Sequence, residues 1–232
     1  AGFDLLSLAN NHSMDYGPEA LLDTVDFIHS FNGGTAGAGK NIYDARSPYY
    51  IQVSGTLVAF LAYSEIVPYS YGATQYSPGI SVASMDYNRD YFCEDIKKAK
   101  ENADIVVVYF HWGEERKFHA DRIQMDFARK AVDMGADLVI GVHPHVLQGI
   151  ERYKNGLIAY SLGNFVFNPS DEASRETIIL QCIFEHEKLS DISLIPVYIQ
   201  SGKPVIATGG RKNKIMERIR NLSAELGFNL NI

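Results

Sequence analysis

The stretch that decides the fold is "DLVIGVHPHVLQGIE", residues 137–151. It begins with an apolar run of the kind that a buried β-strand requires, and this run ends at Gly141. His143 and His145 follow directly, with Pro144 between them. Because proline fixes φ and lacks an N–H group, it would stiffen the loop that carries the two imidazoles. A strand that ends in such a pair predicts a functional site at its carboxyl end.

Strand and helix signals alternate along the chain on either side of this stretch. The apolar spacing predicts helices at 17–31, 90–102, 121–134 and from about 211, and strands at 4–9, 104–110, 177–184 and 192–199. Two hairpins are predicted, turning at Ser54-Gly55 and at Asn155-Gly156, since Asn-Gly favours the type I′ turn. The alternation predicts an α/β fold with a mixed sheet, formed by residues 1–232 as a single domain.

Two glycine-containing segments interrupt this pattern. The segment "GGTAGAGKN" (33–41) has the glycine and lysine spacing of a phosphate-binding P-loop. However, Asn41 stands where a serine or threonine would bind magnesium, and a helix precedes the loop where a strand is required. We therefore interpret this segment as a helix stop followed by a turn. Residues 64–90, rich in Tyr, Ser, Pro and Gly, predict a long loop, and loops of that length are typically functional.

The composition excludes several classes of protein. The chain has 232 residues and a net charge of −7, without a run of lysine or arginine, which argues against nucleic-acid binding. No apolar stretch approaches the roughly 18 residues that a membrane span needs. The opening "AGFDLLSLANNH" has no basic segment of the kind that begins a signal peptide. Two distant cysteines do not indicate a disulfide framework, and they leave the redox compartment open.

Polar side chains follow four of the predicted strands at the points where those strands end. They are Asn10, Asn11, His12 and Asp15 in "ANNHSMDYG", His111, Glu114 and Glu115 in "HWGEE", His143 and His145 in "HPH", and Asn164 in "YSLGNF". Ligands of open α/β sheets gather outside the carboxyl ends of the strands. Neutral imidazole is a common ligand of zinc and related ions. Four of the seven histidines lie at such positions, which favours a metal site over histidines that merely cap strands.

Five segments in order carry a resemblance to a known family. They are "ANNHSMDYG", "GAGKNIYDARSP", "HWGEE", "ADLVIGVHPHVLQGIE" and "YSLGNFVFN". Together they look like the bacterial capsule-synthesis CapA family, which is associated with poly-γ-glutamate and is similar in fold to the calcineurin-like metallophosphoesterases. The resemblance implies a metallophosphoesterase-like sandwich of mixed β-sheets flanked by helices.

The resemblance also implies roles for individual residues. Metal ligands would be Asn11, His111, His143 and His145; catalytic residues would be His12, as general acid, and Asp15; substrate-binding residues would be Glu115 and Asn164. The cofactors implied are divalent transition metal ions, two in the full-length protein, namely zinc, manganese or iron. Two such ions can clamp a phosphoryl-like group and activate water.

The chain departs from the family pattern at its beginning. The family's opening Gly-Asp strand and its Asn-Leu-Glu segment, which would supply carboxylates to the metal site, are absent, and Arg116 replaces an aromatic residue. The chain is therefore expected to be either a fragment that lacks its N-terminal strands or a degenerate member. We favour the fragment, because the sequence begins within an apolar strand.

Two classes of function stay open. One is a metal-dependent hydrolase of phosphoester or capsule-polymer bonds in poly-γ-glutamate biosynthesis. The other is a non-catalytic accessory protein that binds polymer or a partner during capsule assembly or export. The partners implied by the resemblance are the capsule polymer or its precursor and the membrane proteins of capsule synthesis and export. It also implies an extracytoplasmic location at the cell surface, through an N-terminal segment absent here.

Overall fold

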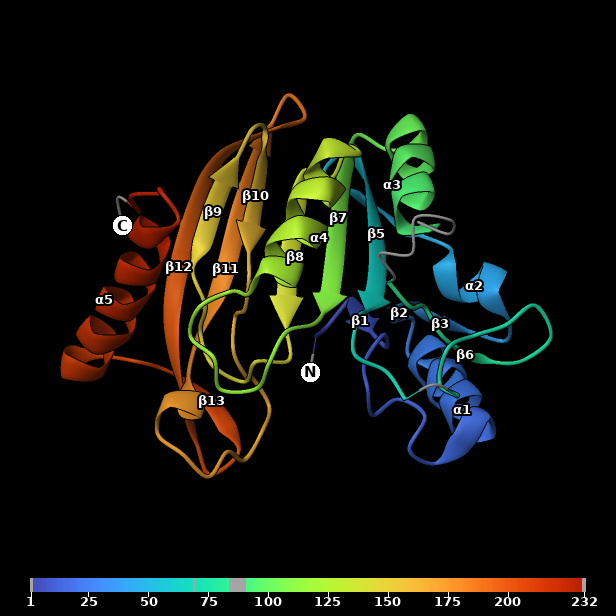
Figure 1. The fold of residues 1–232 in the computed structure, drawn as a ribbon, viewed down its shortest axis with the longest axis horizontal. Helices are drawn as coiled ribbons and strands as arrows, with labels where there is room; N and C mark the ends of the chain where they lie inside the picture. The colour runs from blue at the N-terminus through green and yellow to red at the C-terminus, as the bar shows by residue number, and fades with distance from the viewer. Residues whose placement is uncertain (1, 69, 84–90, 231–232) are drawn as a thin grey trace. The chain divides into compact units, whose positions relative to one another are not determined.

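The computed structural model describes residues 2–68, 70–83 and 91–230. It shows a mixed α/β protein with several sheets flanked by helices, which confirms the predicted fold class (Figure 1). The chain divides into two compact units, Ala1–His111 with Asp133–Ala136, and Trp112–Val132 with Asp137–Ile232. The single domain predicted for residues 1–232 stays a prediction.

The first unit opens with a β-α-β arrangement. Strand β1 (Leu5–Ser7) pairs in parallel with β2 (Gly34–Ala36), and helix α1 (Gly17–Ser30) connects them (Figure 1). Proline lies in the first turn of α1, where its missing N–H costs no hydrogen bond. The helix ends where Asn32 adopts a positive φ of 60°. This arrangement places the "NNH" segment directly after the carboxyl end of β1.

A hairpin and a parallel strand of the first unit lead to His111. Strands β4 (Tyr49–Val53) and β5 (Thr56–Ser64) form the predicted hairpin. Helix α3 (Tyr91–Asn102) leads into β7 (Ile105–His111), which lies parallel to β5 and pairs His111 with Ser64. Both strands thus end at the same level, and His111 lies at their carboxyl end, as predicted.

The predicted turn at 33–41 and the predicted loop at 64–90 contain regular structure that the sequence did not indicate. Besides β2, the first segment contains β3 (Ala38–Gly39), which pairs antiparallel with β6 (Gly79–Ile80). Helix α2 (Ile42–Arg46) follows, and the side chain of Asn41 accepts hydrogen bonds from two of its first N–H groups. Asn41 therefore caps a helix. Residues 84–90 of the predicted loop lie outside the described residues.

The second unit carries the His-Pro-His loop. Helix α4 (Arg122–Asp133) precedes β8 (Leu138–Val142), which is parallel to β10 (Gly156–Ala159). Strand β10 forms the predicted hairpin with β9 (Ile150–Tyr153), but Gly156 already pairs with Tyr153, so the turn residues are Lys154 and Asn155, one position before the predicted Asn155-Gly156. The indole of Trp112 is fully buried and donates to the carbonyl of Tyr160 at 3.0 Å. Trp112 is therefore a core residue at the base of the loop that follows it.

An antiparallel sheet and a long helix complete the second unit. Strands β11 (Glu176–Glu185), β12 (Lys188–Gln200) and β13 (Lys203–Ile206) pair in that order, and the short 3-10 helix η1 (Ala173–Arg175) precedes them. Helix α5 (Gly209–Glu225) runs along β12 (Figure 1). The sequence did not predict β13, whose residues Lys203–Ile206 include a proline and follow a tight turn.

Candidate functional site

The His-Pro-His segment adopts an unusual backbone conformation directly after β8. His143 has a φ of 96° and His145 a φ of 60°, which are left-handed values that non-glycine residues rarely adopt. Each such residue costs about 1–3 kcal/mol and persists only where surrounding contacts hold it. One such contact is the hydrogen bond of 2.7 Å from the Arg116 N–H to the Pro144 carbonyl. The conformation therefore indicates a site at which the direction of both imidazoles matters.

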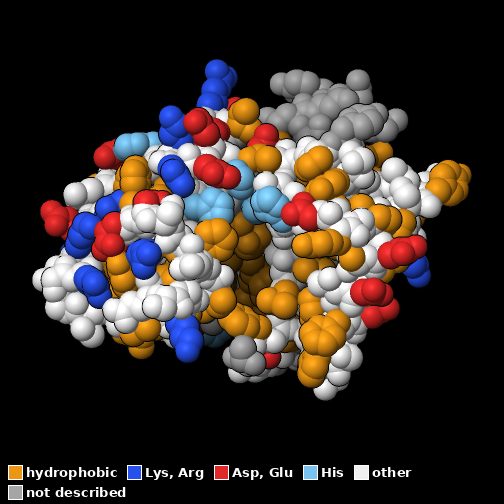
Figure 2. Space-filling model, turned by 90° about the horizontal axis from the view of Figure 1, so that it is seen from below, with side chains coloured by type: hydrophobic (Ala, Val, Ile, Leu, Met, Phe, Trp, Pro, Cys, Tyr) orange, Lys and Arg blue, Asp and Glu red, His pale blue; other side chains and the backbone are white. Residues whose placement is uncertain are grey.

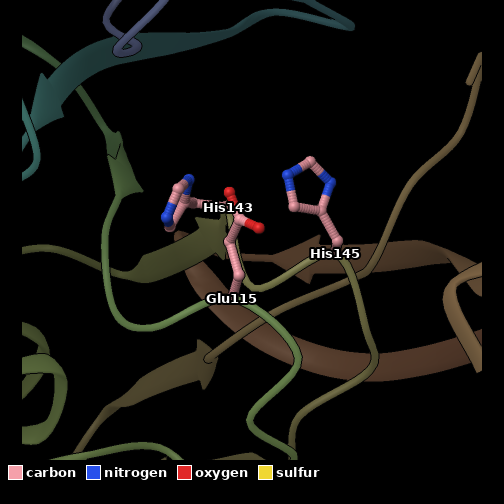
Figure 3. Close-up of side chains that lie close together, drawn as sticks. All are labelled: Glu115, His143 and His145. Carbon is pink, nitrogen blue, oxygen red and sulfur yellow. The ribbon is translucent and has the colours of Figure 1, made fainter. Parts of the chain in front are cut away.

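Glu115 lies with these two histidines. One carboxylate oxygen of Glu115 and one ring nitrogen from each of His143 and His145 all lie within 4.8 Å of one another. Figure 3 shows the three side chains extending toward a common space from two different loops. The Glu115 side chain is exposed and the imidazoles are partly buried. The substrate-binding role that the resemblance implied for Glu115 stays a prediction, and the position of its carboxylate is also that of a potential metal ligand.

Close packing against the end of β8 holds the start of the loop that carries Glu115. The backbone N–H of Trp112 donates to the carbonyl of Val142 at 3.1 Å, which fixes the start of this loop against the end of β8. A Cβ at Gly141 would overlap both the Tyr160 carbonyl and the Trp112 indole, so only glycine fits there. Trp112 and Gly141, which precede Glu115 and His143 in the chain, therefore pack directly against each other.

Asn164 contacts His145 directly. Its side chain is buried, with 8% of its surface exposed, and its Oδ1 lies 2.7 Å from Nδ1 of His145. The ring of Phe167 lies 5.2 Å from the same imidazole, measured between centroids. His145 is thus held by two neighbours besides its own loop. The substrate-binding role implied for Asn164 stays a prediction.

The other two predicted ligands meet in the first unit. Nε2 of His111 lies 2.9 Å from Oδ1 of Asn11, and the His111 side chain is only 9% exposed. An amide oxygen and an imidazole nitrogen are both able to bind a metal ion. The structure therefore brings the predicted residues together in two groups, Asn11 with His111 and Glu115 with His143, His145 and Asn164.

The two predicted catalytic residues, His12 and Asp15, contact each other, and a third residue contacts Asp15. Nδ1 of His12 lies 2.9 Å from Oδ2 of Asp15, and the Tyr71 hydroxyl donates to Oδ1 of Asp15 at 3.1 Å. The hydrogen bond with His12 lowers the pKa of the Asp15 carboxyl below its ordinary value, and the bond from Tyr71 adds to this. Desolvation, followed by the bond to Asp15, raises the pKa of the Tyr71 hydroxyl. Sequence reasoning missed Tyr71, which lies 56 residues away in a loop with several tyrosines.

Comparison with known sequences identifies the family. The sequence model of the family described as "Bacterial capsule synthesis protein PGA_cap" matches residues 1–169. This chain belongs to the PGA_cap family. Every residue assigned to the candidate site, from Asn11 to Asn164, lies inside the part that matches PGA_cap. The resemblance drawn from the five sequence segments is thereby confirmed.

Two similar proteins of Bacillus support the assignment to this family. The chain is 37% identical to the "Capsule biosynthesis protein CapA" of Bacillus anthracis over 94% of its length and 54% of that protein. It is 34% identical to the "PGA biosynthesis protein CapA" of Bacillus subtilis (strain 168), over 97% of this chain and 58% of that one. The chain thus spans about half the length of these curated relatives.

A solved structure shares the fold of this PGA_cap member. The crystal structure of a hypothetical protein from Thermus thermophilus superposes with a TM-score of 0.53 at 16% identity, covering 84% of this chain and 76% of that one. At this identity the likeness shows a common fold alone, and the specific kinship with metallophosphoesterases stays a prediction. Among the residues that the structure describes, no helix combines the length and apolar character needed to cross a membrane.

Proposed function

We propose that this chain takes part in poly-γ-glutamate capsule biosynthesis as a metal-dependent hydrolase of phosphoester or capsule-polymer bonds. The observation that carries the hydrolase proposal is the group formed by Glu115, His143 and His145 on strained, well-supported loops. The names of the two CapA relatives support the role in the capsule. Strained backbone at a cluster of titratable side chains is typical of functional sites.

The donor set fits a divalent transition metal. Two neutral imidazoles and one carboxylate are the protein ligands of many catalytic zinc sites, which keep a further position open for water or substrate. Zinc, manganese and iron(II) all accept these donors. Asn11 and His111 offer donors for a second ion, in keeping with the two ions that the family resemblance implies. When bound, such ions polarise the scissile group and make water more acidic.

His12 and the residues that contact it would carry out the proton transfer of the reaction. With both ring nitrogens protonated, His12 would donate from Nδ1 to Asp15 and could deliver the proton on Nε2 to a leaving group. Tyr71, through its bond to the other oxygen of Asp15, orients that carboxylate. The chain thus contains an acid whose ring orientation is set by two successive hydrogen bonds.

The substrate would be anionic and would be recognised largely through the metal. Figure 2 shows lysine and arginine side chains interspersed with acidic ones on the face drawn, without a continuous basic surface there. The chain as a whole carries a net charge of −7. A divalent ion would supply the positive charge that a phosphoryl group or a γ-glutamyl polymer requires. We further propose an extracytoplasmic location at the cell surface, together with membrane proteins of capsule synthesis and export and without nucleic acid.

The test compares two adjacent glutamates. Glu115→Gln removes the carboxylate of the cluster, whereas Glu114→Gln changes an exposed neighbour whose side chain pairs with Lys117. We expect Glu115→Gln to weaken zinc or manganese binding and to abolish hydrolysis of a model phosphodiester or of poly-γ-glutamate, and Glu114→Gln to do neither. A wild-type protein whose zinc or manganese content does not exceed the background of the measurement would overturn the proposal. A metal-loaded protein that hydrolyses neither substrate would favour the accessory function.

A further inference from the structure

The side chain of Asn164 makes three contacts that together determine its orientation. Its amide nitrogen Nδ2 donates to the carbonyl of Ser174 at 3.0 Å and to the carbonyl of His145 at 3.3 Å. Its oxygen Oδ1 lies 2.7 Å from Nδ1 of His145. Because carbonyl oxygens only accept hydrogen bonds, the Nδ2 group must face them, and a flipped amide would place two oxygens against each other. The amide has one consistent orientation.

This orientation specifies which nitrogen of His145 carries the proton. An amide oxygen accepts and never donates, so the short contact between Oδ1 and Nδ1 requires a hydrogen on Nδ1. A neutral imidazole has one N–H group and one lone pair, so Nε2 of His145 then keeps the lone pair. Metal-binding histidines commonly have their other ring nitrogen fixed in this way by an outer partner.

The surroundings of Asn164 hold it rigidly enough for this purpose. Ser174 is buried, and both its N–H and its hydroxyl donate to the carboxylate of Asp171, at 2.9 and 2.8 Å. The carbonyl of Ser174 that Asn164 contacts is therefore itself well positioned. The bond from Asn164 to the His145 carbonyl also supports the left-handed backbone of that residue.

We propose that Asn164 is a positioning residue, which holds His145 in its Nδ1–H tautomer so that Nε2 is available as a ligand beside Glu115 and His143. The part that concerns metal affinity rests on the proposed function; the tautomer follows from the hydrogen bonds alone. Asn164 would thus act on the substrate only through His145, and not by direct contact.

The tautomer can be measured without any metal. Nitrogen NMR of the metal-free protein, at a pH at which imidazole is neutral, distinguishes protonated from unprotonated ring nitrogens. We expect His145 to be protonated on Nδ1 in the wild type. Asn164→Leu removes the acceptor and should move the proton toward Nε2. Asn164→Asp loses the two bonds that Nδ2 donates but keeps the acceptor for Nδ1, so its folded form should preserve the wild-type tautomer. Asn168→Leu, an exposed neighbour, is the matched control.

Zinc titration of the same proteins supplies the second readout. Loss of such an outer partner typically weakens metal binding by about 10–100-fold, so Asn164→Leu should show a loss of this size and Asn168→Leu none. A wild-type His145 protonated on Nε2, or an Asn164→Leu variant with unchanged tautomer and zinc affinity, would overturn the proposal. A wild type that shows the Nδ1–H tautomer but binds no zinc would overturn the proposed metal function and leave the tautomer assignment standing. If neither variant folds, the spectrum of the wild type alone still decides the tautomer.

Discussion

Nε2 of His111 lies 2.9 Å from Oδ1 of Asn11, although 100 residues separate the two in the chain. The contact forms because β7 ends at His111 and β1 ends a few residues before Asn11. Both strands belong to the same compact unit. Two residues predicted as ligands from separate motifs thus lie within hydrogen-bonding distance.

Asn11→Leu tests what this contact contributes when no metal is bound. The substitution keeps the approximate side-chain volume but removes the oxygen that Nε2 of the nearly buried His111 contacts. We expect a loss of about 1–3 kcal/mol in the free energy of unfolding, since a polar group of a buried side chain loses this partner. Urea unfolding in the presence of a chelator measures this loss. Asn221→Leu, an exposed position on α5, should change stability by less than about 0.5 kcal/mol.

His12→Ala tests the proposed acid. If His12 delivers a proton in the rate-limiting step, the variant should lower kcat by about 10²–10⁴-fold and leave the metal content unchanged. Tyr71→Phe, which removes one hydrogen bond to Asp15, should cause a smaller loss in the same direction. His186→Ala, at an exposed turn, serves as the control. Loss of metal in His12→Ala would mean that His12 is itself a ligand.

Gly141→Ala tests whether close packing positions the site. The added methyl group would overlap backbone at Tyr160 and the Trp112 ring, so we expect a destabilisation of about 1–3 kcal/mol or more. Trp112 is the only tryptophan of the chain, so its fluorescence reports on the change directly. Gly210→Ala, where nothing lies within 4 Å of the new atom, should have little effect. Equal stability of the two variants would contradict the packing described here.

The lowered pKa of Asp171 predicts that the stability of the protein depends on pH. Hydrogen bonds from Ser174 lower the pKa of this carboxyl below its ordinary value of 3.8, with a smaller contribution from Arg116. Above 3.8 the group is ionised in both folded and unfolded chains, and its stabilisation is fully present. As the pH falls from there toward the lower folded-state pKa, the unfolded chain takes up the proton first, and the stabilisation is lost.

Asp171→Asn provides the comparison for this effect. Urea unfolding of the wild type and the variant, followed from about pH 6 to about pH 2, should show stabilities that converge in acid. The variant should already lack the contribution at neutral pH. A constant difference across the whole range would show that Asp171 does not titrate with folding.

The sequence alone determined most of the longer elements and the strand ends at which the candidate site residues lie. Local signals suffice where a strong turn sequence separates two strands, as at Ser54-Gly55, where a tight turn joins β4 and β5 as predicted. The apolar run predicted to end at Gly141 corresponds to β8, which ends one residue later at Val142, so the histidine pair lies at the carboxyl end of this strand. Elements of two or three residues, such as β2 and β3, carried no such signal, because their pairing partners are distant in sequence.

The tertiary structure decided which polar side chains meet. Glu115 is one of two adjacent glutamates in an exposed loop, and its carboxylate lies near His143 and His145 where the bond from Arg116 to Pro144 and the packing at Gly141 hold the loops together. Tyr71 and Asn164 likewise acquire their partners across 56 and 19 residues. The direction of a side chain in a loop depends on contacts between distant segments, which no local pattern of residues encodes. Residue types and strand ends therefore indicated the candidate residues, and long-range packing determined which of them lie together.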